Sequence, residues 1–187
     1  FTADHGELLG DYHCYGKRSM HDAPARIPML VYQKGVFEGG NQIDTPVSLV
    51  DLAPTFLETA GVDPAPLHMD GQSLVKREAG YVYSIFSCYQ EVRNGSAKTI
   101  PEMFRNNLQL FKEVCGNYMI TDGEWKYIYS APDHKEFLFD LVHDQETRNR
   151  AGVASCKPHE LRLKKQLMAF LEQEGITNLS ENGEWIS

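Results

Sequence analysis

The chain has 187 residues, 42% of them hydrophobic and 24% charged, an ordinary globular composition that excludes a wholly disordered protein. Its 18 basic and 26 acidic residues give a net charge of −8, which argues against a nucleic-acid partner, because phosphate backbones require clustered positive charge. No apolar run approaches the ~18 residues of a membrane-spanning helix, so no transmembrane segment is predicted.

The chain opens on residues typical of the end of a strand. Residues 1–3 are strand-like and residues 4–6 read as the loop beyond it, so we expect the chain to be a C-terminal piece of something larger. A mature N-terminus left by processing is the alternative. Residues 5–26 predict a loop with short turns, residues 26–32 a buried strand, and residues 35–46 a surface turn.

The clearest predicted helix covers residues 48–60, where apolar residues recur at steps of three and four and Gly61 follows as a stop signal. Pro54 lies inside this run and predicts either a kink or a short first turn before the main helix. The apolar positions are Leu49, Leu52, Ala53, Phe56, Leu57 and Ala60.

The second half of the chain predicts mainly antiparallel structure. Strand-like runs cover 80–89, 118–121, 126–129 and 137–139, and helical patterns cover 101–114 and 158–174. Asp122-Gly123 is a strong hairpin signal, so the last three strands predict an antiparallel meander. The aromatic residues Trp125, Tyr127 and Tyr129 indicate cross-strand packing, with sugar stacking as the alternative.

These elements divide near residue 78. Residues 1–78 are interpreted as the end of an α/β domain built on a sheet. Residues 79–187 are interpreted as a smaller α+β lobe of antiparallel strands with a terminal helix.

Asp4 and His5 are the first candidate site, because ligands in open α/β sheets bind beyond the carboxyl ends of strands. An adjacent carboxylate and imidazole can reach one cation if the backbone turns there, which Gly6 allows. A carboxylate favours calcium or magnesium, whereas imidazole favours manganese or zinc. In the alternative interpretation Asp4 caps a turn and His5 is merely exposed.

Lys17 follows 13 residues after Asp4. A lysine near a divalent cation is useful if an anion bridges them, and the pair would then share a tetrahedral oxyanion. A solvated loop lysine is the alternative. His13, His21 and His68 are spare imidazoles that could protonate a leaving group or simply lie at the surface.

Four segments, in family order, resemble the sulfatase family of the alkaline phosphatase superfamily. They are residues 2–10 with Gly16-Lys17, residues 47–56 with Ala60-Gly61, residues 70–74, and residues 125–128 with 138–141 and 144–149. The resemblance implies the C-terminal part of an alkaline-phosphatase-like fold and the hydrolysis of sulfate esters. The implied substrate is a sulfated small molecule or glycan.

The resemblance also implies a site. Asp4 and His5 would be metal ligands, most often for calcium, with manganese or magnesium as alternatives. Lys17 would bind the sulfate and assist the leaving oxygen. His13 is a second substrate-binding candidate, because Gly10-Asp11-Tyr12-His13 stands where relatives often have Gly-Asp-His-Gly. Arg26 would brace the loop.

Two parts of the family site are missing from the sequence. The family nucleophile is a formylglycine made from Cys or Ser in a C/S-x-P-x-R motif, and no such motif occurs here. The first acidic metal pair is missing as well. We therefore expect residues 1–78 to hold half of the metal and sulfate site, with the missing N-terminal portion of the enzyme as its partner. The chain alone should not turn over.

The alternatives are a phosphodiester or phosphonate monoester hydrolase of the same superfamily, or a non-catalytic lobe that binds sulfated glycans or a partner chain. The family favours the periplasm, the extracellular space or the lysosome.

Overall fold

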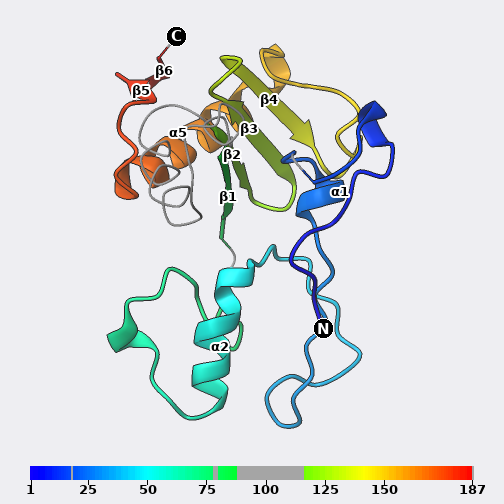
Figure 1. The fold of residues 1–187 in the computed structure, drawn as a ribbon, viewed down its shortest axis with the longest axis vertical. Coiled ribbons are helices and arrows are strands. Elements are labelled where there is room, and N and C mark those ends of the chain that lie inside the picture. Colours follow the sequence, from blue (N-terminus) through cyan, green and yellow to red (C-terminus); the bar gives the residue numbers. More distant parts are fainter. Residues whose placement is uncertain (18, 78–79, 88–115, 187) are drawn as a thin grey trace, which may run out of the picture. The chain divides into compact units, whose positions relative to one another are not determined.

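The computed structural model describes residues 1–17, 19–77, 80–87 and 116–186 (Figure 1). The helix predicted over 101–114 lies outside these residues. The chain divides into two compact units. The first unit contains Phe1–Lys17 and His21–Val82, and the second contains Tyr83–Ser187 together with a short segment that includes Met20.

The first unit consists of short helical turns joined by loops. Its elements are η1 (Asp11–His13), α1 (Asp22–Ala25), η2 (Leu49–Asp51), α2 (Leu52–Thr59) and η3 (Ala65–Leu67). The loop with short turns over 5–26 and the exposed turn over 35–46 are therefore confirmed.

The buried strand predicted over 26–32 is wrong. Met29 forms an isolated antiparallel bridge with Thr2, and the Leu30 N–H donates to the Phe1 carbonyl at 2.8 Å. Leu30 and Tyr32 are 65% and 73% exposed. A buried strand needs covered faces and paired edges, and among the described residues this run has a single bridge.

The helix predicted over 48–60 is confirmed as η2 followed by α2. Pro54 lies in the first turn of α2, where backbone N–H groups have no partner inside the helix, so the proline removes no hydrogen bond. The short first turn expected before the main helix is η2. The buried face differs from the expected one, because Phe56 is 67% exposed while Pro54 and Thr55 are buried.

Asp51 joins α2 to the chain that follows it. Its carboxylate, 1% exposed as a residue, accepts three hydrogen bonds. The donors are the backbone N–H groups of Ser48 and Gln72 and the guanidinium of Arg77, at 2.8, 2.9 and 2.6 Å. This network holds residues 47–56 and 70–74 next to each other. A buried carboxylate is stable only when its oxygens accept hydrogen bonds.

The second unit is a four-stranded sheet covered by a long helix (Figure 1). The sheet has the order β1 (Val82–Ser87), β2 (Gly116–Thr121), β3 (Trp125–Ser130), β4 (Lys135–Asp140). It is followed by η4 (Ala154–Cys156), α5 (Lys157–Gln173) and the small hairpin β5 (Ser180–Glu181) and β6 (Glu184–Trp185). The β2–β3–β4 meander and the terminal helix are confirmed.

The core of the second unit lies where α5 packs on β2 and β3. Leu163, Leu167 and Leu171 are almost completely buried, whereas Leu161 on the same helix is 49% exposed. The aromatic stripe is part of this packing, because Trp125 stacks on His159 and Tyr129 stacks on Trp185, with ring centroids 4.3 and 3.9 Å apart. The packing interpretation is therefore confirmed. No helix among the described residues is long and apolar enough to span a membrane.

Candidate functional site

The Asp4 carboxylate and the His5 imidazole lie beside each other in the first unit. Nδ1 of His5 lies 2.8 Å from the Gly6 carbonyl oxygen, which can only accept, so Nδ1 carries the proton. In the neutral imidazole Nε2 is then the nitrogen with the free lone pair, and it lies 3.4 Å from Oδ2 of Asp4. The Asp4 side chain is 85% exposed and that of His5 is 36% exposed, so both remain accessible.

This geometry suits two neighbouring ligands of one cation. A nitrogen at ~2.1 Å and an oxygen at ~2.4 Å from an ion, at a right angle, lie ~3.2 Å apart. A carbonyl that accepts from the second ring nitrogen is also the usual device that orients a metal-binding histidine. The pair is incomplete as a site, because the described residues contain no group of three or more His, Cys, Asp or Glu that could hold a metal.

Gly6 positions the pair by a close backbone approach. Its N–H donates to the Pro24 carbonyl at 2.8 Å, and a Cβ at this position would lie 2.0 Å from the Ala23 carbonyl oxygen. The sequence suggested that Gly6 matters because it allows a turn. The structure gives a different reason, which is that no side chain fits between the two segments.

Lys17 is returned toward Asp4 by the closure of the loop between them. The Leu8 N–H donates to the Gly16 carbonyl at 3.0 Å, and the Gly16 N–H donates to the Glu7 carboxylate. The pKa of Asp4 is lowered, first by a hydrogen bond from its own backbone N–H and further by the charges of His5 and Lys17. The pairing of Leu8 with Gly16 brings the residue before Lys17 back alongside the segment that follows Asp4 and His5.

The remaining candidate residues predicted from the sequence have surroundings that differ from those of Asp4 and His5. His13 is exposed in η1, His68 is exposed after η3, and the His21 ring stacks on Tyr12 with centroids 4.3 Å apart. Arg26 is exposed, and its guanidinium lies 3.4 Å from the Asp22 carboxylate one helical turn earlier. The role of His13 in substrate binding stays a prediction.

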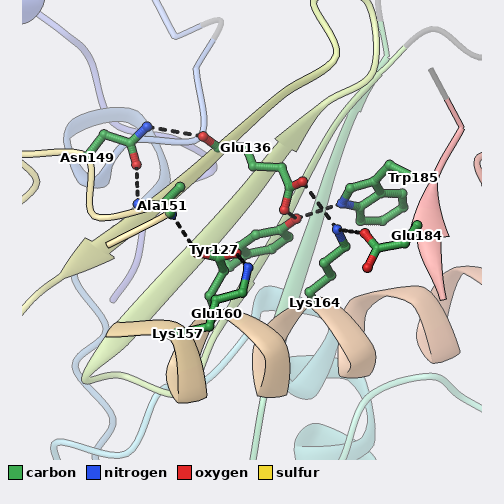
Figure 2. Close-up of polar contacts among 10 residues, drawn as sticks. Tyr127, Glu136, Asn149, Ala151, Lys157, Glu160, Lys164, Glu184 and Trp185 are labelled. Atoms are coloured by element: carbon green, nitrogen blue, oxygen red, sulfur yellow. Dashed lines mark hydrogen bonds and ion pairs between the residues drawn. The ribbon is translucent and has the colours of Figure 1, made fainter. Parts of the chain in front are cut away.

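A second polar cluster, in the second unit, was not predicted from the sequence (Figure 2). The Tyr127 hydroxyl donates to Glu136 at 2.5 Å and accepts from the Trp185 indole N–H at 2.6 Å. The Lys164 ammonium lies 3.2 Å from Glu136 and 2.6 Å from Glu184. Figure 2 shows these side chains converging from β3, β4, α5 and β6.

This cluster is suited to holding elements together. Burial, followed by the hydrogen bond to Glu136, raises the pKa of Tyr127 far above its ordinary value, so the hydroxyl stays protonated as a donor. A tyrosine and a lysine with partners on several elements stabilise the packing of α5 on the sheet. The sequence alone did not indicate this cluster, because Glu136 and Lys164 have the local pattern of solvated surface charges.

Comparison with known proteins identifies the class. Residues 10–173 match the family described as "N-sulphoglucosamine sulphohydrolase, C-terminal", so the chain belongs to this family of C-terminal sulfatase domains. The recognition made from the sequence is therefore confirmed. Lys17 lies inside the matched range, and Asp4 and His5 precede it.

Individual relatives agree with this assignment. The chain is 34% identical over 164 residues to arylsulfatase K of Xenopus laevis, which covers 86% of this chain and 29% of that protein. It is 32% identical over 154 residues to the multifunctional alkaline phosphatase superfamily protein PehA of Trinickia caryophylli, covering 81% of this chain and 30% of that protein. The chain thus spans about three tenths of the length of these relatives.

A solved structure supports the fold. The phosphonate monoester hydrolase of Silicibacter pomeroyi superposes with a TM-score of 0.71 and 26% sequence identity, covering 96% of this chain and 35% of that chain. The predicted fold class, the C-terminal part of an alkaline-phosphatase-like fold with an α+β lobe, is confirmed by this match.

Proposed function

We propose that this chain is the C-terminal part of a sulfatase that hydrolyses sulfate esters of a small molecule or glycan. The observation that carries the proposal is the pair of Asp4 and His5 side chains 3.4 Å apart in a member of a sulfatase C-terminal family, with Lys17 at the end of a loop that closes back toward them. The coverage of about three tenths of arylsulfatase K supports a longer enzyme whose remaining part supplies the other ligands and the formylglycine nucleophile.

In this proposal the residues of the chain have distinct roles. Oδ2 of Asp4 and Nε2 of His5 hold a divalent cation, most often calcium by resemblance, with manganese or magnesium as alternatives. The bound cation stabilises negative charge on the sulfate oxygens. The Lys17 ammonium binds a sulfate oxygen and stabilises the charge that develops on the leaving oxygen. His13 is kept as a second substrate-binding residue.

In this proposal the two segments of the chain also have different roles. Residues 1–78 complete the catalytic domain with half of the metal and sulfate site. Residues 79–187 form the C-terminal lobe that packs as an antiparallel sheet and helix.

The decisive experiment uses the full-length protein that carries this chain. Lys17→Met and Asp4→Asn are compared with Lys34→Met, a control at an exposed lysine of the same unit. We expect kcat/KM for an aryl sulfate to fall at least ~100-fold in the first two variants, the usual effect of removing one stabilising group. The control should stay within about twofold of the unmodified enzyme. Wild-type activity in Lys17→Met would contradict the proposal.

A phosphonate monoester or phosphodiester hydrolase is the second candidate. It is favoured by the similarity to the phosphonate monoester hydrolase of Silicibacter pomeroyi and to PehA. Sulfate and phosphonate esters present similar tetrahedral oxyanions, so the same ammonium and cation would serve both. Measuring kcat/KM for a sulfate ester, a phosphonate monoester and a phosphodiester separates the two. A higher value for either phosphorus ester would replace the sulfatase proposal.

A further inference from the structure

The segment that follows β4 forms a pocket within the second unit. The pocket has a volume of about 410 Å³, which falls in the ~300–1,000 Å³ range of small-molecule sites and is larger than a single ion needs. Ligand pockets are usually lined by apolar side chains. This one is lined mainly by polar ones, so it suits a hydrophilic ligand; they include His143, Asp144, Thr147, Arg148 and Arg150.

The Arg150 guanidinium is held in place by a buried carboxylate. Its Nε and Nη2 atoms each lie 2.9 Å from Oδ2 of Asp144, whose side chain is 9% exposed. The other carboxylate oxygen, Oδ1, has no hydrogen-bond partner in the part of the chain that the structure describes. Arg150 is therefore the counter-charge of Asp144, and this side-on pairing leaves the Nη1 end of a guanidinium that is 31% exposed to donate elsewhere.

The backbone around Arg150 is fixed as well. The Arg150 N–H donates to the Leu138 carbonyl of β4 at 2.7 Å, and the Thr147 N–H donates to the Asp144 carbonyl at 3.0 Å. The Asn149 side chain accepts from the Leu138 N–H at 2.9 Å. A pocket whose donors are ordered before binding loses less conformational entropy when a ligand arrives.

Two further side chains complete the lining. Arg148 is exposed, and the described residues give it no ion pair, so its charge is available to an anion. Nδ1 of His143 lies 2.9 Å from both oxygens of Asp140, which accept, so Nδ1 carries the proton. In the neutral imidazole Nε2 then accepts a hydrogen bond, and the His143 side chain is 77% exposed.

We propose that this pocket is a binding site for an acidic saccharide. Two guanidinium groups match the planar, multi-acceptor geometry of a sulfate or carboxylate group, and Arg150 is already oriented for it. The imidazole acceptor and the Thr147 hydroxyl match the hydroxyl groups of the sugar ring. Every side chain of this site belongs to the second unit. The inference therefore goes beyond the proposed hydrolysis and does not depend on it.

The test measures binding to the full-length protein with three tetrasaccharide probes. One is derived from heparin and carries sulfates and carboxylates, one is derived from hyaluronan and carries carboxylates alone, and cellotetraose is neutral. The variant is Arg148→Gln, at an exposed position where folding is not at risk. The matched control is Lys165→Gln, which removes one positive charge from an exposed position of α5. Arg148→Lys, which keeps the charge and loses the fork, is the second variant.

Calorimetry and amide hydrogen exchange provide two independent readouts. In the unmodified protein, the heparin or the hyaluronan probe should slow exchange of a peptide covering residues 142–150 at least ~3-fold. Arg148→Gln should raise the Kd of that probe at least ~10-fold at this site, the effect of losing charge-assisted hydrogen bonds, and abolish the protection. Arg148→Lys should weaken binding by a smaller factor, and Lys165→Gln by less than about twofold.

The two acidic probes identify the group that is bound, since protection by both indicates a carboxylate and protection by the heparin probe alone indicates a sulfate. Equal weakening in Arg148→Gln and Lys165→Gln would overturn the site in favour of general electrostatics. Absence of protection at 142–150 with both acidic probes, or equal protection by cellotetraose, would overturn it too. So would tighter binding of a Glu/Asp hexapeptide at the same peptide, which would assign the pocket to an acidic protein partner.

Activity on a small aryl sulfate keeps this inference separate from the proposed function. The kcat/KM for that ester should change less than about twofold in Arg148→Gln, because the pocket contains none of the residues proposed for hydrolysis. If the full-length protein hydrolyses no sulfate ester, the proposed function fails, while the exchange and calorimetry results still decide whether the pocket binds an acidic saccharide.

Discussion

Replacing Gly6 with alanine tests whether the close backbone approach positions the Asp4–His5 pair. A Cβ at this position would lie 2.0 Å from the Ala23 carbonyl oxygen, whereas real contacts of this kind stay above 3.0 Å. The two backbone segments must therefore separate by at least 3.0 − 2.0 = 1.0 Å. The 2.8 Å hydrogen bond from Gly6 to the Pro24 carbonyl would lengthen to ~3.8 Å and be lost.

The expected effect has a structural and a catalytic part. A broken hydrogen bond that leaves a partly buried donor without a partner costs about 1–3 kcal/mol, so the urea midpoint of the full-length protein should fall. A displacement of about 1 Å at a reacting group costs ~100-fold in rate, so kcat/KM for the ester substrate should fall by about that factor.

Gly39→Ala is the matched control, since a Cβ there has nothing within 4 Å and its φ is not positive. This variant should leave both the urea midpoint and kcat/KM close to those of the unmodified protein. The reasoning is refuted if Gly6→Ala behaves like Gly39→Ala in both measurements.

Three further predictions concern the rest of the chain. Leu167→Ala should destabilise the protein by about 2–5 kcal/mol in urea unfolding because the side chain is fully buried, whereas half-exposed Leu161→Ala should cost much less; equal losses would contradict the packing of α5. Burial tends to raise the pKa of Asp122, but hydrogen bonds from the Trp125 N–H and Arg162 outweigh it, so the pKa is lowered overall. The ionised Asp122 carboxylate therefore stabilises the folded protein above about pH 4, and this contribution is lost as the pH falls through the lowered pKa. Asp122→Asn should therefore flatten the stability profile between about pH 5 and 3, and an unchanged profile would exclude this residue as the cause. The isolated chain should bind calcium weakly and show no turnover, because two ligands are fewer than a divalent cation requires, and a tight site by calorimetry would argue against a shared metal site.

Part of the candidate site was readable from the sequence. Asp4 and His5 are adjacent, so their proximity needed only a suitable backbone, and in the structure Nε2 of His5 lies 3.4 Å from Oδ2 of Asp4. Lys17 required the closure of an intervening loop, which a resemblance could suggest but spacing could not. The reason for Gly6 was missed because the carbonyl that excludes a side chain belongs to Ala23, 17 residues later.

The elements that the sequence alone determined are those whose signal is local. The meander of β2, β3 and β4, the turn at Asp122-Gly123 and the helix α5 follow from side-chain periodicity and turn residues, which act within a few positions. The apolar run over 26–32 has the same local signal and is nevertheless exposed, because burial depends on neighbours that periodicity does not specify.

Only the tertiary structure determined which charged residues are buried and which partners they have. Lys126 interrupts an aromatic stripe and reads as a solvated position, yet register and the fold of the segment after β4 bring Glu146 and the Met20 carbonyl to it. Glu146 is 20 positions from Lys126 in the sequence, and Met20 is 106 positions from it. The free energy of these contacts depends on burial that only the assembled sheet provides.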